Sequence, residues 1–141
     1  MTFKEIFAIS NKSGLFSMVQ QRKDGAVMQA LTPSKTREFV PTRNHMFSPL
    51  YSISIFTNDG DNKPLLEVML EMKARLNELP LPDANASGDS LRQYFTQILP
   101  THAADRVYNS DIKKLIKWFQ ILMEHDLVNP IPEEENANSN A

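Results

Sequence analysis

Cysteine is absent from the 141 residues of this chain. Its absence excludes disulfide frameworks, thiol nucleophiles and thiolate metal sites, and it fits a reducing compartment. The chain also lacks any run of the roughly 20 apolar residues that a membrane-spanning helix needs. Lys4 and Glu5 interrupt the N-terminal stretch that would have to form the apolar core of a signal peptide. We therefore expect a cytoplasmic protein with no membrane partner.

A strong excess of one charge is missing as well. The chain has 15 basic and 17 acidic residues, for a formal net charge of −2. Residues 1–62 carry a net charge of +2, and residues 63–128 carry −1. Neither segment has the positive excess expected of a protein held to nucleic acid by phosphate neutralisation alone. The hydrophobic share of 41% and the charged share of 23% are typical of a globular chain of one domain or two small ones.

One short helix is expected at the N-terminus. Thr2 and Glu5 have the spacing of a capping box, and the apolar residues Ile6, Phe7 and Ile9 follow them. Residues 10–14 are a cluster of turn formers, so the helix is expected to stop there.

Four or five short strands are expected after this helix. An Asp-Gly pair between residues 15–20 and 26–31 predicts a hairpin, because both turn positions can take positive φ. A third strand is expected over residues 36–40. The clearest strand is expected at residues 51–55, where isoleucine alternates with serine in the pattern of a half-buried strand. Such a set predicts a small barrel or a strongly bent antiparallel sheet.

From residue 63 the apolar residues recur with the period of a helix. Helices are expected over residues 63–79, from a cap at Asp89 or Ser90 to Leu99, and over residues 109–126. The polar turn at residues 57–62 separates them from the strands. The predicted class is α+β, with three regions: a β-barrel domain at 1–57, a three-helix domain at 63–128 and a disordered acidic tail at 129–141. The two halves are expected to pack together, because a domain of about 60 residues buries only about 60% of its unfolded surface.

Residues 3–10 (FKEIFAIS) with 14–16 (GLF), 52–57 (SISIFT) and 108–114 (YNSDIKK) are similar to an uncharacterised Bacteroidetes family. Its members pair an N-terminal domain of unknown function with a C-terminal helical domain of unknown function. The resemblance extends over most of residues 1–128 and implies an SH3-like β-barrel in the first half. Between residues 35 and 49 this chain is more polar and longer, which implies a loop insertion. No catalytic residues carry over.

Histidine is the first candidate for acid–base or metal chemistry. His45, His102 and His125 are not within a helical turn of one another, and no metalloprotease spacing occurs. Residues 58–62 (NDGDN) crowd oxygen ligands together but fail the EF-hand template, whose glycine and closing glutamate are missing from the required positions. P-loop, dinucleotide and nucleophile-elbow patterns are also missing. We therefore expect a protein that is not an enzyme and that has no metal and no cofactor.

Trp118 and Ile121 fall outside the apolar stripe of the third predicted helix when residues are placed at 100° intervals, and they lie beside Lys114 and Lys117. They must either pack on another part of the same chain or remain exposed. Tryptophan is enriched where partners anchor. These four residues are therefore the candidate contact of an interaction or adaptor module, whose partner is another protein or a second copy of the chain.

Nucleic-acid binding is the alternative function. The first half contains the basic residues Arg22, Lys23, Lys35, Arg37 and Arg43. Phe16, Phe39 and Phe47 are interleaved with them, as in surfaces that contact phosphates and stack bases. The net negative charge of the chain and its acidic tail oppose this interpretation, and no RNP-like or helix-turn-helix signature is present.

Overall fold

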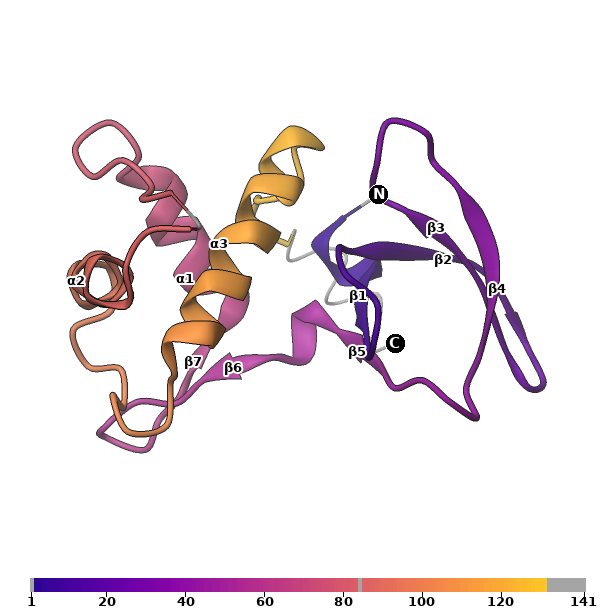
Figure 1. Ribbon diagram of the computed structural model, residues 1–141, viewed down its shortest axis with the longest axis horizontal. Coiled ribbons are helices and arrows are strands. Elements are labelled where there is room, and N and C mark those ends of the chain that lie inside the picture. The colour runs from indigo at the N-terminus through magenta and orange to yellow at the C-terminus, as the bar shows by residue number, and fades with distance from the viewer. Residues whose placement is uncertain (1, 84, 132–141) are drawn as a thin grey trace.

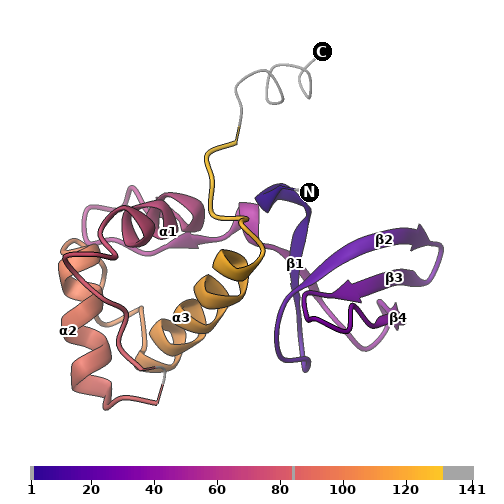
Figure 2. The ribbon, with the colours of Figure 1, turned by 90° about the horizontal axis from the view of Figure 1, so that it is seen from above.

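The computed structural model describes residues 2–83 and 85–131. A sheet and a group of helices stand side by side, with α3 between the other helices and the sheet (Figures 1 and 2). In chain order the elements are η1 (Phe3–Glu5), β1 (Ile6–Ile9), β2 (Phe16–Arg22), β3 (Gly25–Ala30), β4 (Arg37–Pro41), β5 (Phe47–Pro49), η2 (Leu50–Ser52), β6 (Ser54–Ile55), β7 (Lys63–Pro64), α1 (Leu65–Ala74), α2 (Gly88–Ile98) and α3 (Asn109–Glu124).

The first five strands form one antiparallel sheet in the order β4-β3-β2-β1-β5. β1 pairs with both β2 and β5, so the chain returns to its own beginning before it enters the helices. The edge strands β4 and β5 do not pair with each other, and β6 and β7 form a separate two-stranded ribbon. The expected α+β class is confirmed, but the strands among the described residues do not form a closed barrel.

The predicted N-terminal helix is wrong beyond its first turn. Phe3–Glu5 forms a single 3-10 turn, and the Thr2 side chain makes no capping hydrogen bond. Ile6–Ile9 is instead strand β1, with Ile6 and Ile9 buried. A helix of this length is unstable without tertiary support. As a strand, the same residues gain backbone hydrogen bonds on both sides, from β2 and from β5.

The predicted hairpin is confirmed as β2–β3, but its glycine serves a different purpose. Arg22 pairs with Gly25, so the two-residue turn is Lys23-Asp24. Gly25 lies outside the positive-φ region. A Cβ atom at this position would collide with the backbone oxygen of Val40. Glycine is therefore required because β4 approaches closely, and not because of the turn conformation.

The strand predicted at residues 51–55 is also mostly wrong. The fifth sheet strand is β5, and the chain then makes the 3-10 turn η2, in which Leu50 is fully buried and accepts a hydrogen bond from the Ile53 nitrogen at 3.1 Å. Only Ser54–Ile55 forms a short strand, paired with β7. The alternation does report burial, since Ile53 and Ile55 pack against the core while Ser54 is exposed.

The three predicted helices are confirmed, with changes at their ends. α1 ends at Ala74, and turns continue the chain to Leu79, whose nitrogen donates to the Arg75 oxygen at 2.7 Å. α2 begins at Gly88, and its cap is Ser87, whose hydroxyl oxygen accepts from the Ser90 nitrogen at 3.2 Å. That cap satisfies an amide that the first turn leaves without a helical partner.

Two apolar cores hold the molecule together. The main core crosses from the sheet to the helices, because Phe3, Ile6, Leu15, Leu31 and Leu50 of the first half belong to one buried cluster with the apolar faces of α1, α2 and α3. The sheet core is smaller and consists of the buried residues Ile9, Phe16, Ala26, Met28 and Val40. The expectation that the two halves pack together is confirmed.

The C-terminal segment after α3 is described as far as Ile131, which packs against the main core. The Lys73 ammonium group donates to the Val128 oxygen at 2.8 Å and to Asn129 Oδ1 at 2.9 Å. The predicted disordered tail at 129–141 lies outside the described residues from position 132 onward. Within the described part of the chain, no helix is long and apolar enough to cross a membrane.

Candidate protein-interaction site

Helix α3 positions the residues that the sequence singled out. Its buried stripe faces the main core and consists of Ile112, Leu115, Ile116, Phe119 and Leu122. Trp118 and Ile121 lie half-buried beside this stripe and also contact the main core. Lys114 and Lys117 are exposed. The Lys114 ammonium group lies 5.8 Å from the centroid of the Trp118 ring, within the range of a cation–π contact.

All four predicted contact residues line one pocket of about 310 Å³, which we call the sheet-side pocket. One wall is α3, and the opposite wall is the loop between β1 and β2. Gly14 in this loop has a φ of 85°, a conformation that favours glycine, and the space where its Cβ would stand is open. The lining residues are Ala8, Lys12, Ser13, Gly14, Lys113, Lys114, Lys117, Trp118 and Ile121.

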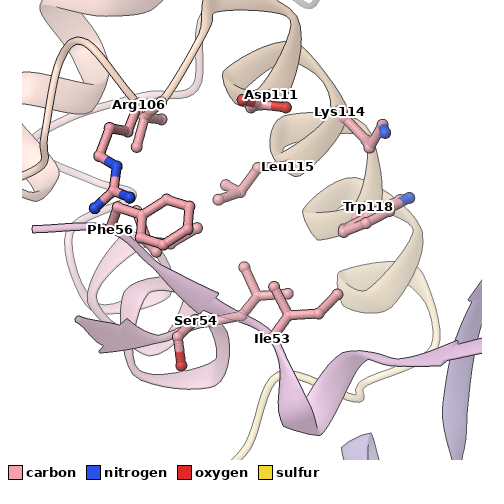
Figure 3. Close-up of a pocket in the computed structure, with 11 residues that line it drawn as sticks. Ile53, Ser54, Phe56, Arg106, Asp111, Lys114, Leu115 and Trp118 are labelled. Carbon is pink, nitrogen blue, oxygen red and sulfur yellow. The ribbon is translucent and has the colours of Figure 1, made fainter.

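A second pocket of about 240 Å³ also borders Trp118 (Figure 3). We call it the hairpin-side pocket because β6, which forms a two-stranded hairpin with β7, provides one of its walls. Ile53 and Leu115 point toward the same space from opposite sides (Figure 3). At the rim, the guanidinium carbon of Arg106 lies 4.5 Å from the centroid of the Phe56 ring. The lining residues are Ile53, Ser54, Ile55, Phe56, Leu65, Arg106, Val107, Asp111, Lys114, Leu115 and Trp118.

The charged residues that line the two pockets are mostly basic. Five cations line them: Lys12, Arg106, Lys113, Lys114 and Lys117. The one acidic lining residue is Asp111, whose Oδ2 accepts a hydrogen bond from the Tyr108 nitrogen at 2.9 Å. Lys12 pairs with Glu38 at 3.2 Å, whereas the other four cations form no ion pair within the described residues. The residues around the two pockets therefore carry a net positive charge, although the net charge of the chain is −2.

Sequence reasoning missed two residues of the hairpin-side pocket, Phe56 and Arg106. Phe56 follows the alternating isoleucines directly, and its exposed fraction of 42% is unusual for phenylalanine. Arg106 lies in the loop before α3, where no periodic pattern marks it. Only the fold brings these two side chains together, because 50 residues separate them in the chain.

The structure divides the predicted nucleic-acid contacts into two groups. Arg22, Lys23 and Arg43 lie near the β2–β3 turn, where the Thr42 nitrogen donates to the Asp24 oxygen at 3.0 Å. Lys35 and Arg37 lie at the other end of β4. All five basic side chains are exposed.

The aromatic residues predicted to stack bases differ in their availability. Phe39 is exposed, and the guanidinium carbon of Arg22 lies 6.0 Å from the centroid of its ring. Phe16 is buried in the sheet core, so it cannot stack on a base, and Phe47 is half-buried against the same core. One of the three predicted aromatics is therefore presented to solvent as a stacking surface.

The three histidines contact backbone oxygens through Nδ1. The distances are 3.0 Å from His45 to Ser10, 2.7 Å from His102 to Leu99 and 3.0 Å from His125 to Ile121. His102 is buried, and its Nε2 lies 3.1 Å from Nη1 of Arg92. Among the described residues, no three His, Asp or Glu side chains form a group that could hold a metal ion.

The turn at residues 57–62 connects β6 to β7. The Thr57 hydroxyl donates to Asp59 Oδ1, and it accepts from the Asn62 nitrogen at 2.9 Å. Asp59 Oδ1 also accepts from the Asp61 nitrogen at 3.0 Å. The hydrogen bond from Thr57, followed by that from Asp61, holds the pKa of the Asp59 carboxyl below its usual range. These hydrogen bonds order the turn internally.

Comparison with known proteins places the chain in a family. Residues 3–50 match a domain of unknown function (DUF5606), and residues 53–122 match a second domain of unknown function (DUF6852). A Bacteroides vulgatus protein, solved in solution by NMR as a structural genomics target, is 31% identical, with 89% of this chain and 88% of that chain covered and a TM-score of 0.69. No curated protein matches. The chain belongs to this family of paired domains of unknown function, in agreement with the resemblance seen in the sequence.

Proposed function

We propose that the protein is a cytoplasmic, non-enzymatic interaction module that binds an acidic segment of a partner protein in the sheet-side pocket. The observation that carries the proposal is the convergence of Lys113, Lys114 and Lys117 around Trp118 and Ile121. An acidic segment complements these charges, and one of its apolar side chains fills the space beside the indole ring. The absence of cysteine supports the cytoplasmic location.

The way in which the pocket is anchored also supports this function. The loop wall ends in Leu15, which is buried in the main core, and the α3 wall is attached to the same core through Ile116 and Phe119. A site whose walls are fixed before binding loses less conformational freedom when the partner arrives.

The strand order supports an SH3-like relationship for the sheet. β1 to β4 follow one another across the sheet, and β5 returns to pair with β1. This connectivity resembles that of small, partly open barrels. A fold-level analogy of this kind says nothing about the site, so the binding proposal rests on the pocket alone.

Selection of random peptides displayed on phage, against the full chain, tests the proposal. Selected peptides are expected to combine acidic residues with an apolar residue. Synthetic copies should shift the emission of Trp118, the single tryptophan, and should bind more weakly as the salt concentration rises. Lys117→Glu is expected to weaken binding about tenfold or more, whereas the matched reversal Arg43→Glu on the sheet should change it less than about twofold.

Three results would contradict the proposal. They are a selection that enriches no peptide, peptides without acidic residues, and equal effects of Lys117→Glu and Arg43→Glu. Sedimentation of the chain alone measures its oligomeric state and so tests whether a second copy of the chain occupies the pocket instead. A dimer that dissociates when Lys117 is changed to Glu would show that the sheet-side pocket binds a second copy of the chain and not a partner protein.

A second candidate function is nucleic-acid binding on the outer face of the sheet. The observation that favours it is the contact between Arg22 and Phe39, because a basic group beside an exposed ring can hold a phosphate and stack a base. Arg37 lies on the same face, two residues before Phe39 along β4. A gel shift with mixed single- and double-stranded oligonucleotides is then expected at low salt and should be lost with Phe39→Ala. No shift at low salt would contradict this function.

A further inference from the structure

The hairpin-side pocket is not used by the proposed function, yet it adjoins the sheet-side pocket directly. Lys114 and Trp118 line both pockets. Since these residues are four apart, they form a ridge along α3. Leu115 and Asp111 line only the hairpin-side pocket, whereas Lys117 and Ile121 line only the sheet-side pocket. The two pockets therefore open on opposite sides of one ridge.

The chemistry of the hairpin-side pocket suits an apolar side chain within an acidic sequence. Ile53 and Leu115 point into the cavity and give it an apolar interior (Figure 3). Arg106 stacks on Phe56 at the rim, and arginine and aromatic residues are common at positions that dominate binding energy. Asp111 accepts a hydrogen bond from the Tyr108 nitrogen and keeps its negative charge, but Arg106 and Lys114 outnumber it, so the lining side chains carry a net positive charge.

We infer that the partner segment is one extended acidic chain that crosses α3 over Lys114 and Trp118 and places an apolar side chain in each pocket. This inference rests on the proposed function. A helix with its side chains is about 10 Å across, and an extended chain advances about 3.3 Å per residue. Alternate side chains of an extended chain point to opposite faces, so the two apolar side chains are expected two or four residues apart. A helical segment would reach both pockets with anchors about seven residues apart, at about 1.5 Å per residue, so the spacing of the apolar residues in the selected peptides distinguishes the two conformations.

Charge reversal on each side of the ridge tests the inference with the selected peptides. Arg106→Glu changes only the hairpin-side pocket, and Lys117→Glu changes only the sheet-side pocket. Each is expected to weaken binding about tenfold or more, while Arg43→Glu serves as the control for long-range charge. Because all three side chains are exposed, the variants are expected to fold, which circular dichroism and a melting curve check. Arg106→Ala is a milder variant and should weaken binding in the same direction.

The peptide supplies an independent control. Replacing the apolar residue that occupies the hairpin-side pocket by alanine should remove the sensitivity to Arg106→Glu and preserve the sensitivity to Lys117→Glu. Unchanged binding in Arg106→Glu, together with weakened binding in Lys117→Glu, would overturn the two-pocket inference and leave the proposed function standing. Unchanged binding in both variants would overturn both.

Discussion

The sheet and the helices bury their apolar residues in different ways. The sheet covers its own small core with one face, and Ile6 of β1 joins the main core, whereas Val19 and Phe39 on β2 and β4 are exposed by 40% and 42%. The helices share their core with five side chains from the first half of the chain. The helical half therefore depends on the sheet half for its interior. The sheet-side pocket lies at the junction between the two halves.

The two cores should respond differently to truncation. Phe119 is fully buried in the main core, so Phe119→Ala is expected to lower the free energy of unfolding by about 3 to 5 kcal/mol. Urea unfolding followed by circular dichroism and by Trp118 emission should give coincident transitions, because this core spans both halves.

Met28 is equally buried in the sheet core, and Met28→Ala is expected to cost about 2 kcal/mol because the small core can relax around the space. The same urea titration measures this change. A larger loss of stability for Met28→Ala than for Phe119→Ala would contradict the expectation that truncation costs more in the main core than in the sheet core.

Glycine substitutions sharpen the contrast between the halves. Gly25→Ala forces a methyl group against the Val40 backbone and is expected to cost about 1 to 2 kcal/mol, with shifted amide resonances along β3 and β4. Gly88→Ala is the control, because the atoms nearest its Cβ belong to the Asn109 side chain, which can rotate away, and not to the backbone. Thermal melting should show little loss for Gly88→Ala. Equal losses at both positions would argue against a close approach of β3 and β4.

Removal of a hydroxyl group from the β6–β7 turn and from α2 should have different effects on stability. Thr57 donates to Asp59 and accepts from Asn62, so Thr57→Val is expected to cost about 1 kcal/mol. The Tyr94 hydroxyl is buried with no hydrogen-bond partner among the described residues, and burial raises the pKa of Tyr94 to about 12. Tyr94→Phe is therefore expected to change the free energy of unfolding by less than about half a kcal/mol. A large loss for Tyr94→Phe in chemical denaturation would reveal a partner for this hydroxyl.

The smallest effect concerns pH. The Thr57 hydroxyl and the Asp61 amide lower the pKa of Asp59 in the folded state, so the charged carboxylate stabilises the turn above the unfolded pKa of about 3.9. That contribution is lost as the pH falls through the folded pKa. The difference in melting temperature between the wild type and Asp59→Asn should therefore be present at neutral pH and shrink below about pH 4. A difference that grows on acidification would contradict the assignment.

Periodicity predicted the elements whose burial is regular. The helices were found because their apolar residues repeat on one face, and helical angles alone brought Trp118, Ile121, Lys114 and Lys117 to one side of α3. Strand β5 could not be predicted in this way, since Phe47–Pro49 is too short to show a period and ends in proline.

The parts of the two pockets that could not be predicted from the sequence depend on contacts between residues far apart in the chain. The opposite wall of the sheet-side pocket comes from the β1–β2 loop, and Arg106 contacts Phe56 at the rim of the hairpin-side pocket. No local pattern specifies such contacts, because they depend on the shared core that orients the two halves.

NMR titration with a selected acidic peptide, followed through the backbone and indole resonances, would show whether the junction binds the peptide. The shifts are expected on both walls at the junction, in residues 12–14 of the loop and residues 113–121 of α3, with the Trp118 indole N–H among the largest. Shifts confined to the outer face of the sheet, around Arg22 and Phe39, would contradict this expectation.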